Sequence, residues 1–525
     1  MVKEFIQKLE NKNYNFASWL ALIASVIIVR VILESVSSNG YNPYNLVNIL
    51  HLTIFFLTLL LSLILVAAFF TKERIEQISK FFAFGFFLLW SAPIVDLLLS
   101  WGKGYQMAYM FVGINDLISN LFSFFGPILS PGITFGMRVQ ILLAMLALTW
   151  YVWHKTRSLW KAVSTFIVSY LVAFFYGALP SLFVYVAHPA HLDSGREEII
   201  DTLFTPKSIF AIEFFDTEKL FDVHMALVLL PILIIQLLIW YGLISKEKLW
   251  AFLKNLRLLR LLFQIVALGS GIYLGSIVLN QPLDLSAAGI LMVLALALAV
   301  ISAWSFSVIV NDYYDTAIDA VTNKNRPLIK KTISQEEFIY LGVVSFIISV
   351  LAAGIVGYVF FLLIMGINAL SYVYSALPLR LRRFPFLTSF VIALATLFIA
   401  MSGFALFTGD NNLSSFPKSI IGLILIIFTL VLNAKDIKDR EGDKANNVIT
   451  IPTLLGERAG KLVIGTLIFA SFTLFAIILQ NFMLFVGSLG FGIVGFFLVY
   501  DKRAKEKYVF ILYALYMILV LLTTF

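Results

Sequence analysis

Two short acidic clusters interrupt the apolar background of this chain, and they share one spacing. Each carries aspartates at positions i, i+3 and i+7, a pattern that one face of a helix brings together. The aspartates are Asp312, Asp315 and Asp319 in the first cluster and Asp436, Asp439 and Asp443 in the second. Carboxylates this close repel one another unless a cation lies between them. Mg²⁺ is the expected cation, because it binds one or two carboxylates and completes its coordination with water and phosphate oxygens.

All six aspartates, together with Asn311, are therefore predicted metal ligands of a site that receives a diphosphate. Asn311 and Asp315 lie one helical turn apart and are expected to bind one magnesium ion. Asp439 and Asp443 are expected to bind a second ion. The outer carboxylates of the two clusters, Asp319 and Asp436, are expected at the edges, where they ligate through water or orient a second substrate.

Basic residues beside the two clusters, and two more in the segment between them, supply the cations that a diphosphate needs. Those expected to contact its phosphate oxygens are Lys324, Arg326, Arg380, Arg382, Lys435 and Lys438. When a bond to a diphosphate leaving group breaks, negative charge develops on the phosphate oxygens. Fixed cations and divalent metal ions stabilise that charge.

The composition indicates a membrane protein. Hydrophobic residues make up 61% of the chain, charged residues 13%, and the mean hydropathy is +0.95. Apolar runs of membrane-spanning length recur from end to end without the alternation of a β-barrel, which predicts an all-α polytopic protein. The net charge of +8 is accounted for by basic cytoplasmic loops, so no nucleic-acid partner is predicted. The chain has no cysteine, which excludes disulfides and thiolate chemistry.

About fifteen spans are expected, arranged as six followed by nine. The first six lie near 16–36, 49–70, 81–101, 135–153, 163–187 and 223–244. The other nine lie near 261–279, 285–310, 338–356, 357–374, 386–407, 419–433, 459–479, 482–500 and 508–525. This order predicts an N-terminal six-span domain of unknown role (1–245), a basic amphipathic linker (246–260) and a nine-span domain (261–525).

Lysine and arginine concentrate in alternate loops of this arrangement. By the positive-inside rule, the N-terminus and both acidic clusters are expected on the cytoplasmic side of the cell membrane. Within the first six spans, Arg30 and Glu34 lie one turn apart, and Asp96 and Arg138 are isolated charges. Structural pairing is the expected role of these four residues.

From 261 onward, the chain resembles the UbiA-type intramembrane prenyltransferases in three stretches. The family's Asn-Asp-x-x-Asp-x-x-x-Asp motif is matched by the first cluster and continues into Arg326-Pro327-Leu328. Its second motif matches Asp439 and Asp443 and is followed by a Thr-x-Pro-x-x-x-Gly stretch at Thr450, Pro452 and Gly456. Between the motifs, the segment from Tyr374 to Arg382 is similar to a third family motif.

The resemblance implies a nine-helix bundle that transfers an isoprenyl group from an isoprenyl diphosphate to a hydrophobic acceptor within membrane lipids, using magnesium, with two ions expected. It also implies catalytic roles for Asp319, Arg380 and Tyr374. An apolar bundle would keep water from the allylic cation and house the isoprenoid tail. Among the family's acceptors, an archaeal-type ether-lipid precursor is favoured, with quinone, chlorin and phosphoribosyl acceptors as alternatives. No oligomeric state is predicted.

Two other functions fit parts of the chain. A transporter of an anionic lipid or metal would use the acidic clusters as ion sites, although transporter charges are typical of interrupted helices near the bilayer midplane. Alternatively, the N-terminal half binds or moves a lipid while the C-terminal half catalyses.

Overall fold

The computed structural model describes most of the chain. The described residues are 2–11, 15–37, 46–100, 109–126, 133–187, 195–205, 207–214, 216–408, 412–445, 449–501 and 506–524. By internal packing, the chain forms two compact units. The first unit comprises Met1–Trp250, Asp284–Ala295 and Gly354–Val356, and the second comprises Ala251–Leu283, Leu296–Ala353 and Gly357–Phe525.

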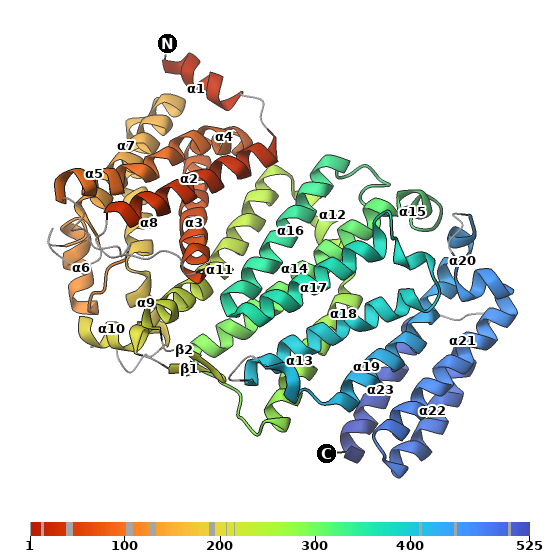
Figure 1. Cartoon of the computed structure of the whole chain (residues 1–525). Coiled ribbons are helices and arrows are strands. Elements are labelled where there is room, and N and C mark those ends of the chain that lie inside the picture. The colour runs from red at the N-terminus through yellow and green to blue at the C-terminus, as the bar shows by residue number, and fades with distance from the viewer. Residues whose placement is uncertain are drawn as a thin grey trace. The chain divides into compact units, whose positions relative to one another are not determined.

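The first unit is built from helices and one small hairpin (Figure 1). Its helices up to the hairpin are α1 (Val2–Glu10), α2 (Phe16–Ser37), α3 (Leu46–Thr71), α4 (Ile75–Gly85), α5 (Ser91–Ser100), α6 (Ile114–Phe122), α7 (Phe135–Thr156), α8 (Leu159–Gly177), α9 (Leu179–Ala187) and α10 (Arg196–Phe204), with a 3₁₀ segment at Phe86–Trp90. The hairpin pairs β1 (Lys207–Ile209) with β2 (Ile212–Phe214) in antiparallel register, and α11 (Thr217–Ile244) follows. The next helix, α12 (Lys246–Asn255), begins in the first unit, and its residues from Ala251 belong to the second.

The remaining elements carry both acidic clusters. They are α13 (Leu258–Val278), α14 (Ala287–Tyr314), α15 (Thr316–Thr322), α16 (Gln335–Val356), α17 (Tyr358–Ser375), α18 (Leu387–Phe404), α19 (Lys418–Val431), α20 (Asp436–Ala445), α21 (Ile451–Ile478), α22 (Phe482–Tyr500) and α23 (Glu506–Thr524). Short 3₁₀ segments lie at Leu381–Arg383, Ala405–Phe407, Leu413–Ser415 and Leu432–Lys435.

Local sequence signals explain where several helices begin. Ser334 and Glu337 form a capping box at the start of α16, satisfying backbone amides that the first turn leaves free. Asp216 caps α11 by accepting from two backbone amides of its first turn. Close helix packing depends on small residues: a Cβ at Gly271 on α13 would lie 1.9 Å from the Ala400 carbonyl oxygen of α18.

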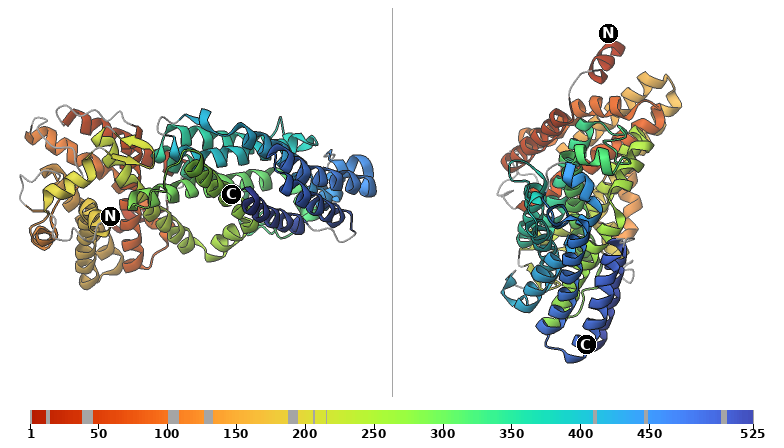
Figure 2. Two further views of the ribbon diagram at one scale, coloured as in Figure 1. Left: turned by 90° about the horizontal axis from the view of Figure 1, so that it is seen from below. Right: turned by 90° about the vertical axis from the view of Figure 1, so that its right-hand side faces the viewer.

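The prediction of an all-α polytopic membrane protein is confirmed. Within the described residues, 13 helices are long and apolar enough to span a membrane, and each overlaps one of the fifteen predicted spans. The predicted span 419–433 is a shorter apolar helix, α19 with its 3₁₀ continuation, and the predicted span 508–525 is α23. The last helices, α21, α22 and α23, pack side by side around the buried rings of Phe472 and Tyr516 (Figures 1 and 2).

Two details differ from the sequence prediction. The segment between α10 and α11 forms the β1–β2 hairpin, whose strands are too short for a periodicity signal. The predicted span 163–187 is divided between α8 and α9, because the chain turns at Ala178.

Candidate active site

The first acidic cluster lies where α14 ends and α15 begins. The sequence predicted one continuous helix face, but Asp315 has φ −101° and ψ 12°, so the helix is interrupted at this residue. Helical hydrogen bonds still bridge the break. The backbone amide of Asp315 donates to the backbone carbonyl oxygen of Asn311 (3.0 Å), and that of Asp319 donates to the carbonyl oxygen of Asp315 (2.8 Å). The three carboxylates therefore remain on adjacent turns, and the break gives Asp315 surroundings of its own.

Asp312 is buried, with 2% of its surface exposed, and its carboxylate faces three residues. Asn255 at the end of α12 donates from Nδ2 to Oδ2 at 2.8 Å. Arg257 forms an ion pair with Oδ1, and Arg326 Nε lies 3.9 Å from the same oxygen. Asn255 and Arg257 were not among the predicted site residues, since 57 and 55 positions separate them from Asp312.

Asp315 is the centre of a second group of contacts. Arg380 Nη2 lies 3.0 Å from Oδ1, and Arg382 pairs with Oδ2. Asn311 donates from Nδ2 to Oδ2 at 2.8 Å, which orients both predicted ligands toward each other. The segment similar to the third family motif thus supplies two guanidinium groups directly to this carboxylate.

Asp319, on α15, shares Arg326 with Asp312. Arg326 Nε lies 3.9 Å from Asp319 Oδ2, and Asn323 donates to Oδ1 at 2.8 Å. Burial raises the pKa of Asp319 above the ordinary range, and the negative charge of Asp312 adds to this, while Asn323 and Arg326 act in the opposite direction. The guanidinium group of Arg326 therefore lies between the first and last carboxylates of the first cluster, Asp312 and Asp319.

The second cluster lies on α20, which packs against α15 (Figure 1). Asp436 is its first residue and is buried, with 6% exposed. The backbone positions of Asp439 and Asp443 continue the i, i+3, i+7 spacing along the same helix. The packing of α15 on α20 brings the two acidic helices together; the side chains of Lys435, Lys438, Asp439 and Asp443 lie outside the described residues.

The stretch from Thr450 to Gly456, after the second cluster, forms the start of α21 and a bend within it. Thr450 caps α21 in a capping box with Thr453. Gly456 has φ 83° and ψ 175°, so the helix bends there in a conformation that favours glycine. Just past the bend, Glu457 contacts Lys461 (3.0 Å) and Arg440 of α20 (3.5 Å), which ties α20 to α21.

The remaining predicted residues hold less central positions. Tyr374 is half-buried near the end of α17, and Lys324 is exposed in the loop after α15. Within the described part of the chain, no three histidine or acidic side chains converge tightly enough to form a metal centre without rearrangement. The metal ligand set therefore stays a prediction.

The donor chemistry of the site fits magnesium and a diphosphate. Its carboxylate and amide oxygens are the ligands that Mg²⁺ prefers. The buried Nε groups of Arg257, Arg326 and Arg380 have no hydrogen-bond partner among the described residues. A buried donor without an acceptor is costly, and phosphate oxygens are suitable acceptors for guanidinium groups.

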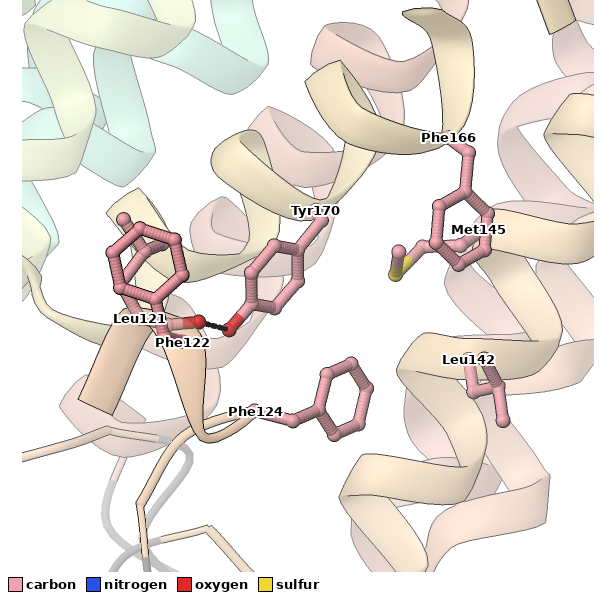
Figure 3. Close-up of a pocket in the computed structure, with 7 residues that line it drawn as sticks. All are labelled: Leu121, Phe122, Phe124, Leu142, Met145, Phe166 and Tyr170. Carbon is pink, nitrogen blue, oxygen red and sulfur yellow. Dashed lines mark hydrogen bonds between the residues drawn. The ribbon is translucent and has the colours of Figure 1, made fainter. Parts of the chain in front are cut away.

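A separate apolar pocket lies in the N-terminal unit. Its volume is about 380 Å³, and it is lined by Leu121, Phe122, Phe124, Leu142, Met145, Phe166 and Tyr170. Figure 3 shows the Tyr170 hydroxyl donating to the Leu121 carbonyl oxygen, so the one polar group of the lining already has a partner. The pocket carries no charge and has no part in the acidic site.

One protein family matches the part of the chain that carries the acidic site. Residues 268–513 match the model of the UbiA prenyltransferase family. The C-terminal half of this chain belongs to that family.

Its relatives cover only part of the chain. Over 198 residues it is 27% identical to a digeranylgeranylglyceryl phosphate synthase of Pyrococcus horikoshii, a match that covers 38% of this chain and 67% of that protein. Over 169 residues it is 32% identical to the chloroplast chlorophyll synthase of Arabidopsis thaliana, covering 29% of this chain and 41% of that one. The solved structure of a UbiA homolog from Archaeoglobus fulgidus bound to GPP and Mg²⁺ covers 51% of this chain and 96% of its own, at 20% identity and a TM-score of 0.40.

Proposed function

We propose that this UbiA-family membrane protein transfers an isoprenyl group from an isoprenyl diphosphate to a hydrophobic acceptor and releases diphosphate. The observation that carries the proposal is the row of buried carboxylates, Asp312, Asp315 and Asp319, each within 4 Å of a guanidinium group. Carboxylates suit metal ions and guanidinium groups suit phosphates, so the two sets together match a metal diphosphate.

On binding, the isoprenyl diphosphate and its magnesium ions would replace the contacts that these carboxylates and arginines make with one another in the structure. Magnesium, with two ions expected, would bind Asn311 and the six aspartates and stabilise the charge that develops on the leaving diphosphate. Arg380 and Arg382 would turn from Asp315 to the phosphate oxygens, and Arg257 and Arg326 would turn likewise from Asp312. Lys324, Lys435 and Lys438 are proposed as further phosphate contacts.

The chemistry after bond cleavage depends on excluding water. The allylic group left by the departing diphosphate is an electrophile, and water would quench it. The helices around the site are strongly apolar, which would keep the isoprenoid tail and the reacting carbon dry. Asp319, whose Oδ2 lies 3.9 Å from Arg326 Nε, is proposed to orient the acceptor or to take its proton. Tyr374 is proposed to line the same space.

The acceptor is proposed to be an ether-lipid precursor that carries a glycerol phosphate. The supporting observation is the similarity to a digeranylgeranylglyceryl phosphate synthase, together with four arginine side chains around one row of carboxylates. The active site is proposed to face the cytoplasm, in keeping with the basic loops beside it. The region 1–245 is proposed to be a separate membrane domain outside the diphosphate chemistry.

The test is a transfer assay with the purified chain in lipid vesicles. Geranylgeranyl diphosphate is supplied with magnesium and one acceptor at a time: geranylgeranylglyceryl phosphate, a quinone precursor such as 4-hydroxybenzoate, or a chlorophyllide. Prenylation of the glycerol phosphate lipid alone supports the proposal in full. Prenylation of another acceptor retains the reaction and overturns the acceptor, and no transfer to any of them overturns the proposed reaction.

A further inference from the structure

The turn between α12 and α13 is fixed on the first acidic cluster by three consecutive residues. Asn255 is buried, with 6% of its surface exposed. The carbonyl oxygen of Leu256 accepts a hydrogen bond from the Trp304 indole on α14 at 2.6 Å. Arg257 adopts a left-handed conformation, with φ 53°, and pairs with Asp312. This turn therefore has one defined position against the end of α14.

Asn255 uses both ends of its amide on charged groups of the site. Nδ2 donates to Asp312 Oδ2 at 2.8 Å, and Oδ1 accepts from Arg326 Nη1 at 3.2 Å. An amide can donate to a carboxylate and accept from a guanidinium at once, which neither a carboxylate nor an ammonium group can do. Asn255 thus connects a predicted metal ligand to a predicted phosphate contact.

We infer that Asn255 is a positioning residue of the diphosphate site, which holds the Asp312 carboxylate and the Arg326 guanidinium in a fixed relation. The inference rests on the proposed function. Groups that hydrogen-bond to a metal-binding carboxylate fix its orientation, and their loss typically reduces metal affinity or activity by about 10-fold to 100-fold.

The contacts distinguish this role from simple helix capping. A capping asparagine bonds to backbone groups of its own helix, whereas the two side-chain bonds of Asn255 reach Asp312 and Arg326, 57 and 71 positions away. With Nη1 held by Asn255, the Nε group of Arg326 stays available to a phosphate oxygen, while the bond from Asn255 Nδ2 keeps Asp312 oriented toward the metal.

The experiment measures binding of inorganic diphosphate to the purified full-length protein by calorimetry, with and without magnesium. The variants are Asn255→Ala, which removes both bonds, and Asn255→Asp, which keeps the size and the acceptor but loses the donor. Lys254→Ala, an exposed neighbour on the same helix, is the control. The expected result is a loss of magnesium-dependent affinity of about tenfold or more for both Asn255 variants, with unchanged binding for the control.

A double-mutant cycle with Arg326→Ala separates positioning from general damage. If Asn255 acts through Arg326 and Asp312, Asn255→Ala causes much less additional loss of affinity when Arg326 is already absent. Full additivity of the two losses, or wild-type affinity in both Asn255 variants, would overturn the inference while leaving the proposed function intact. Absence of magnesium-dependent binding in the unmodified protein would overturn the proposed function and this inference with it.

Discussion

Buried charges occur in both units, but the partners of Arg138 and Asp96 in the N-terminal unit differ in kind from those at the acidic site. In the N-terminal unit, Arg138 donates to the carbonyl oxygens of Phe124 (2.8 Å), Gly126 (2.8 Å) and Phe125 (3.2 Å). Asp96 accepts from the Gly136 amide at 2.7 Å and from the Thr134 hydroxyl. These partners belong to the backbone and to a helix cap, so they cannot leave without local unfolding.

The acidic site pairs its carboxylates with long, rotatable side chains instead. Asp315 faces Arg380 and Arg382, and Asp312 faces Arg257. Such partners can exchange for a metal ion and a phosphate without any change in the backbone. The comparison teaches that neither a buried charge nor a single buried pair such as Arg30 and Glu34 identifies a functional site, whereas a row of carboxylates surrounded by several exchangeable cations does.

The largest expected effect on the rate of transfer comes from removing a proposed metal ligand. Asp315→Ala or Asp439→Ala should reduce transfer by about 100-fold to 1,000-fold, since each removes a proposed metal ligand that stabilises the leaving diphosphate. The measurement is the initial rate with saturating substrates and magnesium, alongside the thermal midpoint. The matched control is Asp96→Asn, which should lower the midpoint and retain the rate per folded molecule. Substantial activity in either site variant would contradict the metal assignment.

A smaller effect is expected from the arginine partners. Arg382→Ala should reduce kcat/KM by about 10-fold to 100-fold, mainly through a higher KM for the isoprenyl diphosphate, because one charge-assisted contact to phosphate is lost. Arg382→Lys should recover only part of this loss, since an ammonium group cannot bond through a planar fork. An unchanged KM in Arg382→Ala would show that this residue stays with Asp315 throughout the reaction.

The smallest effect on transfer is expected in the N-terminal unit. Arg138→Ala should lower the free energy of unfolding by about 3 kcal/mol, because it leaves buried carbonyl groups without a donor. The rate per folded molecule should change by less than about twofold. Leu146→Ala, at a position 49% exposed on the same helix, is the control. If Arg138→Ala instead abolished diphosphate binding in a protein of normal stability, the separation of the two regions would be wrong.

The sequence predicted those features that depend on composition and short spacing. Apolar runs were sufficient for the spans, and the i, i+3, i+7 spacing was sufficient to find Asp312, Asp315 and Asp319 as one group. The stretch Thr450 to Gly456 was found by its motif, and the structure explains it through a helix cap and a left-handed glycine.

Other features could not be predicted, because they arise from tertiary packing. Asn255 and Arg257 belong to a segment whose basic and apolar residues indicated only a linker at the membrane surface. Their contacts with Asp312 depend on the turn that Trp304 fixes, which no local pattern encodes. The interruption at Asp315 is likewise invisible in the spacing, since a continuous helix and a broken one place the same residues one turn apart.

The most direct test of the central claim is the magnesium dependence of isoprenyl diphosphate binding by the full-length protein in lipid vesicles. Labelled geranylgeranyl diphosphate is titrated with magnesium, then with excess EDTA, and then with magnesium restored. If magnesium and the diphosphate replace the arginine partners of the acidic site, binding should be tight with magnesium, lost on chelation and fully recovered when magnesium is restored. Asp315→Ala should show no such cycle. Equal binding in EDTA, or an unchanged cycle in Asp315→Ala, would contradict the account.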